Sequence, residues 1–161
     1  MRVLQFLIAA ALSLLVAACG STSERRSELR ERPVLSEKSS NVVIFALGLI
    51  DTGYRFGGKN PEAGFDCSGM VAYIYGHAAG VKVGGSAADI ARAGRPVPRD
   101  DLHPGDLLFF NTRSSSFSHV GIYIGDGRFV HAPSTRGKVR IDYLATEYYA
   151  QRFETARSYF E

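Results

Sequence analysis

Cysteine is scarce in this chain of 161 residues, which contains only Cys19 and Cys67. Two cysteines exclude a fold held together by several disulfide bonds. Cys19 ends an apolar N-terminal segment, whereas Cys67 lies among polar residues and glycines in residues 64–69 (GFDCSG). If Cys19 carries a lipid, Cys67 has no partner for a disulfide. An unpaired thiol in an exported protein then needs a chemical explanation.

The chain also lacks a cluster of positive charge and an internal repeat. Its net charge is +3, from 19 Lys and Arg against 16 Asp and Glu, and the basic residues are dispersed along the sequence. Such weak and scattered charge argues against nucleic acid as a partner. Residues 41–161 have the size of one ordinary domain.

The one long apolar segment covers residues 3–18 and is interrupted by only two polar side chains. This is about the length of a signal-peptide core and is short for a membrane-spanning helix. The segment ends in small residues before Cys19 and resembles the lipobox of bacterial lipoproteins, in which cleavage precedes a cysteine that receives a diacylglycerol. An ordinary secretory signal cut after Ala18 and an uncleaved anchor are the alternatives.

The resemblance implies a signal peptide over residues 1–18 and a membrane anchor of acyl chains on Cys19. Gly20 follows the cysteine, and the absence of Asp there implies an outer-membrane lipoprotein that faces the periplasm of a Gram-negative bacterium. Residues 20–40 are rich in Ser, Arg and Glu and nearly free of apolar side chains. They cannot bury enough surface to offset their ordering entropy, so the lipidated cysteine and a flexible tether are expected over 19–40. A short charged helix over 24–32 is the alternative.

Helical patterns precede strand patterns in the domain over 41–161. Apolar residues at helical spacing predict helices over 42–50, 68–79 and 86–93, which are ended by Gly53, Gly80 and Gly94. After the turn signal Pro-Gly-Asp at 104–106, the sequence becomes a series of extended segments: LLFF, HVGIYIG, RFVHA, VRIDYL and RFETARSY. Helices followed by an antiparallel sheet predict an α+β fold.

Cys67 is expected at the start of the second helix. Unpaired backbone N–H groups and the positive end of the helix dipole at that position favour a thiolate over a thiol. The same N–H groups can receive the oxyanion of a tetrahedral intermediate. An inert cysteine that packs as a small apolar residue is the alternative.

The histidines His119 and His131 lie on two predicted neighbouring strands. The residues Gly-Asp-Gly at 125–127 predict a three-residue hairpin loop, which pairs Ile124 with Arg128 and places His131 diagonally across from His119 on the same face. A two-residue loop would send the two histidines to opposite faces. A cysteine nucleophile with a histidine base is therefore one hypothesis, and two unrelated histidines on a half-exposed sheet are the other.

Four sequence motifs, which occur in the family's order, resemble the NlpC-type cell-wall cysteine peptidases, a papain-like group. The motifs are YRFGG (54–58), FDCSGMV (65–71), LHPGDLLFF (102–110) and HVGIYIGDGRFVHA (119–132). The resemblance implies a papain-like fold with N-terminal helices packed on a C-terminal antiparallel sheet. It makes Cys67 the nucleophile, His119 the base and His131 the residue that orients the base. It also implies that Tyr54 shapes the oxyanion site, and that Asp66 and Ser68 bind a peptide amine.

By this resemblance the substrate is an amide bond in the stem or cross-link peptides of peptidoglycan. An amidase or acyltransferase on the same scaffold and a non-catalytic wall-binding lipoprotein are the alternatives. Many members carry Pro-Arg-Ser/Thr and a downstream Gln after the cysteine helix, whereas this chain keeps only Ser86 there, which leaves the substrate preference open. A monomer is expected, with no cofactor and no metal, because the Cys/His/His set lacks the short paired spacings of a zinc site.

Overall fold

The computed structural model describes residues 36–134 and 137–160. The predicted signal peptide, the lipidated Cys19 and most of the predicted tether lie outside the described residues. Among the residues that are described, no helix combines the length and the apolar character needed to cross a membrane.

The three expected helices are present, with shifted boundaries. Helix α2 spans Glu37–Gly48, α3 spans Cys67–Ala79 and α4 spans Ala87–Ala93. α2 begins earlier than predicted because Ser36 caps it, with its side chain accepting a hydrogen bond from the Ser39 N–H. Residues 37–40, which the sequence assigned to the tether, therefore belong to this helix.

The sheet has six strands in the order β3-β8-β4-β5-β6-β7, and every neighbouring pair is antiparallel. The strands are β3 (Arg95–Val97), β4 (Leu107–Phe110), β5 (His119–Gly125), β6 (Arg128–His131), β7 (Arg140–Tyr143) and β8 (Phe153–Ser158). The remaining elements are the small hairpin of β1 (Lys59–Asn60) and β2 (Gly64–Phe65), the 3₁₀ turn η2 (Arg99–Asp101) and the short helix α5 (Glu147–Ala150). This arrangement confirms the predicted α+β class with an antiparallel sheet.

Strand β3 was not expected, because its prolines argue against a strand. Pro96 lies within β3, and Pro98 follows it. The strand is at an edge of the sheet and pairs only with β8 among the described strands. A proline at an edge removes no ladder hydrogen bond that the sheet requires, so the position tolerates it.

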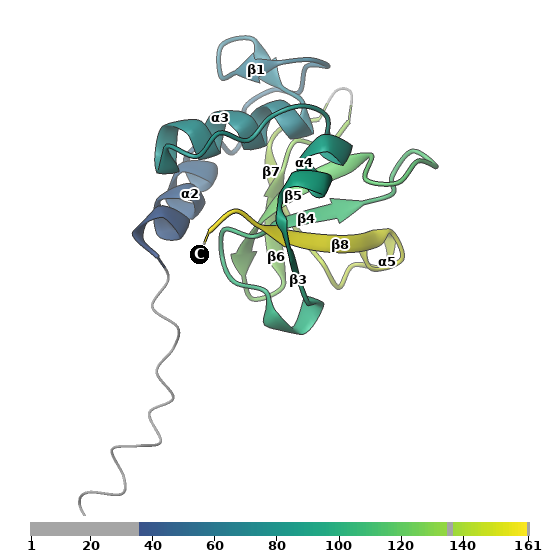
Figure 1. Cartoon of the computed structure of the whole chain (residues 1–161). Coiled ribbons are helices and arrows are strands. Elements are labelled where there is room, and N and C mark those ends of the chain that lie inside the picture. Colours follow the sequence, from purple (N-terminus) through teal and green to yellow (C-terminus); the bar gives the residue numbers. More distant parts are fainter. Residues whose placement is uncertain (1–35, 135–136, 161) are drawn as a thin grey trace, which may run out of the picture. The chain divides into compact units, whose positions relative to one another are not determined.

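Apolar side chains fill both faces of the central strand β4. Leu107 and Phe109 belong to one core cluster together with buried residues of α2, α3 and α4, while Leu108 and Phe110 belong to a second cluster that includes Tyr149 of α5. Figure 1 shows α2 and α3 on one side of the sheet, and α5 next to the start of β8. Burial on both faces explains why β4 reads as a continuous apolar run.

The hairpin of β5 and β6 reaches the predicted histidine register by a different turn. Gly125 pairs with Arg128, so the loop has only two residues, Asp126 and Gly127, whose φ angles of 53° and 68° fit a type I′ turn. A bulge between Tyr123 and Gly125 then shifts the register by one residue. The predicted three-residue loop is therefore wrong, but the bulge restores the side-chain face that such a loop would give.

A close backbone contact fixes the start of α3 against the preceding loop. A Cβ atom on Gly69 would lie 2.0 Å from the carbonyl oxygen of Gly58, which accepts a hydrogen bond from the Asp66 N–H. Only glycine permits this approach. Because Cys67 is two residues before Gly69, the same contact sets the position of the thiol.

We predict opposite effects on stability for two glycine substitutions in α3. Gly69→Ala should lower the free energy of unfolding by about 1–3 kcal/mol, because the new methyl group meets a backbone atom that cannot move freely. Gly76→Ala should raise it by about 0.5–1 kcal/mol, because Ala is the better helix former and, apart from the neighbouring backbone of α3, no atom lies within 4 Å of the added Cβ. Urea unfolding followed by circular dichroism measures both. Equal effects of the two substitutions would contradict the proposed contact.

Candidate active site

Cys67 is the first residue of α3, and Asp66 caps this helix. The Asp66 carboxylate accepts hydrogen bonds from the N–H groups of Gly69 at 2.7 Å and Gly57 at 2.9 Å, and from the Ser68 hydroxyl at 3.2 Å. The N–H group of Cys67 has no acceptor within the described part of the chain, whereas the N–H group of Ser68 interacts with the Cys67 thiol. Both donors lie beside the thiol, and the one on Cys67 is free to receive an oxyanion.

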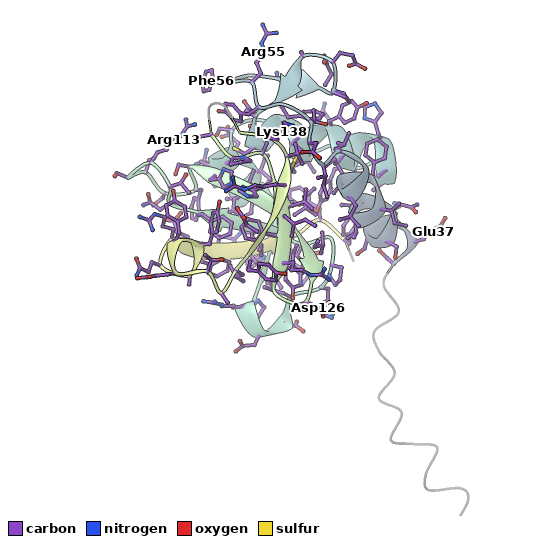
Figure 2. The ribbon with its side chains drawn as sticks, turned by 180° about the vertical axis from the view of Figure 1, so that it is seen from behind. Glu37, Arg55, Phe56, Arg113, Asp126 and Lys138 are labelled. Atoms are coloured by element: carbon purple, nitrogen blue, oxygen red, sulfur yellow. The ribbon has the colours of Figure 1, made fainter. Side chains whose placement is uncertain are left out.

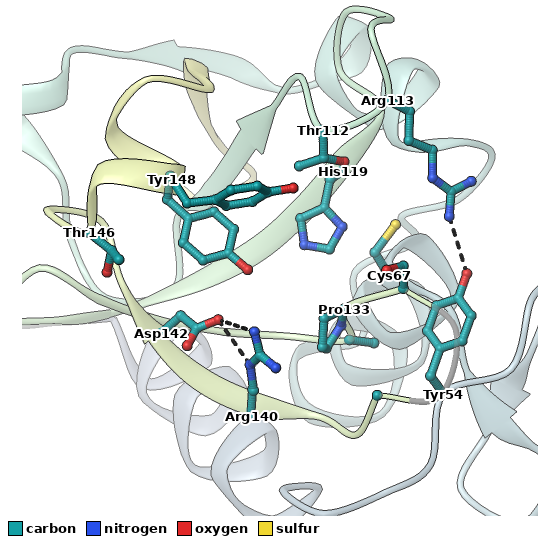
Figure 3. A pocket seen from close by; sticks show the side chains of 14 residues that line it. Tyr54, Cys67, Thr112, Arg113, His119, Pro133, Arg140, Asp142, Thr146 and Tyr148 are labelled. Carbon is teal, nitrogen blue, oxygen red and sulfur yellow. Dashed lines mark hydrogen bonds and ion pairs between the residues drawn. The ribbon is translucent and has the colours of Figure 1, made fainter.

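Cys67 opens into a cleft with a volume of about 590 Å³. Fourteen residues line it: Tyr54, Cys67, Thr112, Arg113, His119, Ala132, Pro133, Ser134, Gly137, Arg140, Asp142, Thr146, Tyr148 and Tyr149. Figure 3 shows the sulfur of Cys67 and the ring of His119 facing this common space. The fold therefore brings together the predicted nucleophile and the predicted base, which are far apart in the sequence.

The two histidines are joined directly by a hydrogen bond. Nε2 of His119 lies 2.8 Å from Nδ1 of His131, and the side chains are 7% and 0% exposed. The prediction that both histidines lie on one face is confirmed. Their rings pack against Phe110 and Phe129, at centroid distances of 6.1 Å and 4.9 Å.

Burial decides the charge state of this pair. It lowers the pKa of His119 to about 3, with a further contribution from the neighbouring His131. Burial also lowers the pKa of His131, although Asp142 opposes that effect. Both imidazoles are therefore neutral at neutral pH, and His119 is able to accept a proton.

Asp142 extends the chain of hydrogen bonds, although no motif in the sequence pointed to this residue. Its Oδ2 lies 2.8 Å from Nε2 of His131, and it accepts hydrogen bonds from Nε and Nη2 of Arg140 at 3.0 Å and 2.9 Å. The Tyr149 hydroxyl lies 3.5 Å from the same nitrogen of His131. Burial alone would raise the pKa of Asp142, but the hydrogen bonds from His131 and Arg140 lower it to about 2.

The expectation of a resting thiolate is not supported. Burial raises the pKa of the Cys67 thiol, and the negative charge of Asp66 adds to the increase. The backbone N–H groups of Val120 and Ser68 and the charge of Arg113 lower it, but they do not outweigh burial. The resting site therefore holds a thiol beside a neutral imidazole, because desolvation penalises the charged form more than the helix terminus favours it.

The predicted substrate-binding residues have different surroundings. Tyr54 lines the cleft, and its hydroxyl lies 3.5 Å from Nη2 of Arg113, a side chain that projects outward from the loop between β4 and β5 (Figures 2 and 3). Asp66 and Ser68 flank the nucleophile but are not among the residues that line the cleft. Their role in binding a peptide amine stays a prediction. Ser86 caps α4 through a capping box with Asp89.

The comparisons with known proteins agree on one family. The sequence model that describes the NlpC/P60 family matches residues 51–158 of this chain. The murein DD-endopeptidase MepH of Escherichia coli K12 is 36% identical over 107 residues, which are 65% of this chain and 40% of that protein. The gamma-DL-glutamyl hydrolase of Bacillus subtilis 168 is 40% identical over 119 residues, which are 73% of this chain and 29% of that protein. The chain therefore spans less than half the length of these two relatives.

A solved structure shows the same fold. The crystal structure of the NlpC/p60 domain of the peptidoglycan hydrolase SagA has a TM-score of 0.65 and 32% sequence identity. The match covers 74% of this chain and 97% of that domain. The described domain therefore corresponds to nearly the whole of an isolated NlpC/p60 domain.

We predict that the Cys67 thiol reacts slowly near neutral pH. Because its pKa is raised, the thiolate forms only as the pH rises above the ordinary value of about 8.5. The rate of alkylation by iodoacetamide, followed by mass spectrometry of the Cys67 peptide, should therefore keep increasing at alkaline pH. The unfolded protein is the control and should reach half of its maximal rate at a lower pH. A native rate that is constant between pH 5 and 8 would indicate a preformed ion pair instead.

Proposed function

The chain belongs to the NlpC/P60 family, and on this premise we propose that it is a peptidoglycan hydrolase that uses Cys67 as its nucleophile. It acts as an endopeptidase on an amide bond in the stem or cross-link peptides of the cell wall. The observation that carries the proposal is the shared cleft, in which Cys67 at a helix start faces His119, itself hydrogen-bonded to His131.

The reaction follows from this arrangement. As the sulfur of Cys67 attacks the amide carbonyl carbon, its proton passes to the neutral His119. The carbonyl oxygen becomes an oxyanion, which the free N–H group of Cys67 stabilises. His119 then donates the proton to the leaving amine as the C–N bond breaks and a thioester remains. A water molecule, deprotonated by His119, hydrolyses the thioester and regenerates the thiol.

The charges in the cleft support a peptide substrate with carboxylate groups. Among the described residues that line it, Arg113 and Arg140 are cationic, and Asp142, which is already paired with Arg140, is acidic. An exposed guanidinium such as that of Arg113 suits a carboxylate or another acceptor group. The two relatives differ in the bond that their names specify, DD in one and gamma-DL in the other. The proposal therefore names an amide bond in wall peptides without choosing between these two types. The fragments released from digested sacculi would identify the bond that is cut.

We predict that Cys67→Ala removes hydrolysis of purified sacculi without changing the fold. Cys67→Ser should be nearly inactive as well, because a hydroxyl is a much weaker nucleophile in a site built for a thiol. His119→Ala should also remove nearly all turnover. His77→Ala is the matched control, since His77 is an exposed histidine on α3 outside the cleft. Muropeptides released from sacculi are identified by mass spectrometry.

Two outcomes of this experiment bear on the alternatives. Retained hydrolysis by Cys67→Ala would exclude cysteine catalysis. A wild-type protein that binds sacculi but releases no muropeptide would instead favour a non-catalytic wall-binding domain.

For the N-terminus we propose a lipid anchor on Cys19, which holds the domain at the outer membrane within reach of the wall. The support is the apolar segment that ends in small residues before Cys19. Two or more acyl chains give stable anchoring, whereas one gives only marginal binding.

We predict that Cys19→Ser blocks acylation, because the thioether link to the diacylglycerol requires sulfur. The variant should lack the mass of the acyl chains and should leave the outer-membrane fraction. Cys67→Ala should keep the acyl chains and stay in that fraction. A wild-type protein recovered from the soluble periplasm with an unmodified N-terminus would exclude the anchor.

A further inference from the structure

Side chains from three neighbouring strands form one line of hydrogen bonds that leads away from the nucleophile. His119 is on β5, His131 on β6 and Asp142 on β7. The two contacts between them are each 2.8 Å long. His131 is fully buried, and the side chain of Asp142 is 25% exposed at the cleft wall. The line therefore runs from the cleft through the protein interior and returns to a carboxylate at the cleft.

This line determines where each proton resides. An ionised carboxylate only accepts hydrogen bonds, so Nε2 of His131 must carry a proton and donate it to Asp142. Nδ1 of the neutral His131 then bears a lone pair and accepts a hydrogen bond from Nε2–H of His119. Nδ1 of the neutral His119 is left unprotonated. It is the one nitrogen of that ring not engaged by His131, and therefore the one available to the Cys67 thiol.

The groups around Asp142 keep it charged and oriented. Arg140 donates two hydrogen bonds to the oxygen that accepts from His131. Tyr149 of α5, which lies close to the same histidine nitrogen, also lowers the pKa of Asp142 through its hydroxyl. Of the charged and titratable groups on β5, β6, β7 and α5, those that face the carboxylate are thus His131, Arg140 and Tyr149, with His119 behind His131.

We propose that Asp142 is a positioning residue that acts through His131: it selects the tautomers of both histidines and stabilises the positive charge that develops on His119 during proton transfer. The role rests on the proposed cysteine hydrolase function, but the tautomers are a property of the protein alone. Asp142 touches neither the thiol nor the scissile bond. Its contribution is to present the unprotonated Nδ1 of His119 to Cys67.

A purely structural role is the competing explanation, because the ion pair of Asp142 with Arg140 lies on β7 at an edge of the sheet. Such a pair resembles that of Asp126 with Arg128, which is also 2.9 Å long and joins residues two positions apart. Asp126 is in the β5–β6 turn, 86% exposed and well away from Arg113 at the cleft (Figure 2). Asp126→Ala and Asp126→Asn therefore remove an ion pair without contacting the histidines, and Asp126→Asn is the closer control because Asn, unlike Ala, readily adopts the φ of 53° at this turn position.

The decisive comparison is between Asp142→Asn and Asp142→Ala. In the asparagine variant, Arg140 should hold the amide oxygen in the position of Oδ2, so His131 keeps its acceptor and only the charge is lost. We expect kcat on sacculi to fall by about 10-fold, a small loss compared with the 10⁴-fold effect of a misplaced tautomer in a serine protease triad. In the alanine variant the acceptor is lost as well, and kcat should fall by about 10²–10³-fold. KM should change little in both variants.

A double substitution tests the orienting role of Arg140. Asp142→Asn combined with Arg140→Met leaves nothing to hold the amide oxygen toward His131, so the amide nitrogen can donate to Nε2 and reverse both tautomers. Its kcat should therefore fall below that of Asp142→Asn and approach that of Asp142→Ala. Arg140→Met alone retains a carboxylate, which cannot donate, so both histidines should keep the wild-type tautomers in that variant.

The tautomers are read directly from two-bond ¹H–¹⁵N correlation spectra of the histidine rings, which distinguish a protonated from an unprotonated ring nitrogen. Wild type, Asp142→Asn and both Asp126 variants should show His119 and His131 protonated at Nε2. Asp142→Ala and the double variant should show a mixture of tautomers or protonation at Nδ1. Thermal unfolding of each variant reports any loss of fold.

The outcomes separate this proposal from the proposed function. If wild type shows Nε2 protonation and Asp142→Ala shifts it, the selection of tautomers holds even where sacculi are not cleaved. If sacculi are cleaved and Asp142→Ala keeps both the wild-type kcat and the wild-type tautomers, the positioning role is wrong. An equal loss of kcat in Asp126→Ala and Asp142→Ala, with unchanged tautomers, would assign Asp142 a structural role.

Discussion

The register of three neighbouring strands is the constraint on which the site depends. β5, β6 and β7 each supply one side chain to a line of two hydrogen bonds of 2.8 Å. A slip of one residue in either ladder would turn a side chain to the other face and break the line. In the β5–β6 hairpin, the bulge beside Gly125 prevents this, since the two-residue turn by itself would place His119 and His131 on opposite faces. Between β6 and β7, the pairing of His131 with Arg140 puts Asp142 diagonally opposite His131.

Burial gives these hydrogen bonds their chemical consequence. Phe110, Phe129 and Tyr149 surround the histidine pair and exclude water from it. In this environment a positive charge on His119 is costly at rest, which is why its pKa falls to about 3. The same low dielectric strengthens the interaction with the carboxylate of Asp142 when that charge develops. In the proposed mechanism His119 is thus a neutral base at rest, and Asp142 supplies the counter-charge when His119 accepts a proton.

The sequence predicted the parts of the site that are local in the chain. Helical spacing and glycine stops indicated the helix that begins at Cys67, and alternation indicated the strands that carry His119 and His131. Asp142 was missed because the connection over residues 132–139 is too long to fix the register of β7 from the sequence. The pKa of Cys67 was predicted in the wrong direction for a related reason. The helix start is visible in the sequence, whereas burial of the thiol arises from segments distant in the chain.

Two carboxylates at opposite ends of the site act on the same proton in opposite ways. Asp66 is committed to capping α3 beside the thiol, and its charge makes a thiolate at Cys67 less favourable. Asp142 lies beyond His131, and its charge acts to raise the pKa of His119, which favours the imidazolium of the proposed mechanism. A stable helix start and a preformed thiolate are therefore in conflict at Cys67. In the proposed mechanism the thiol stays protonated until His119 accepts its proton, so that reactivity depends on the base and on the residues that orient it.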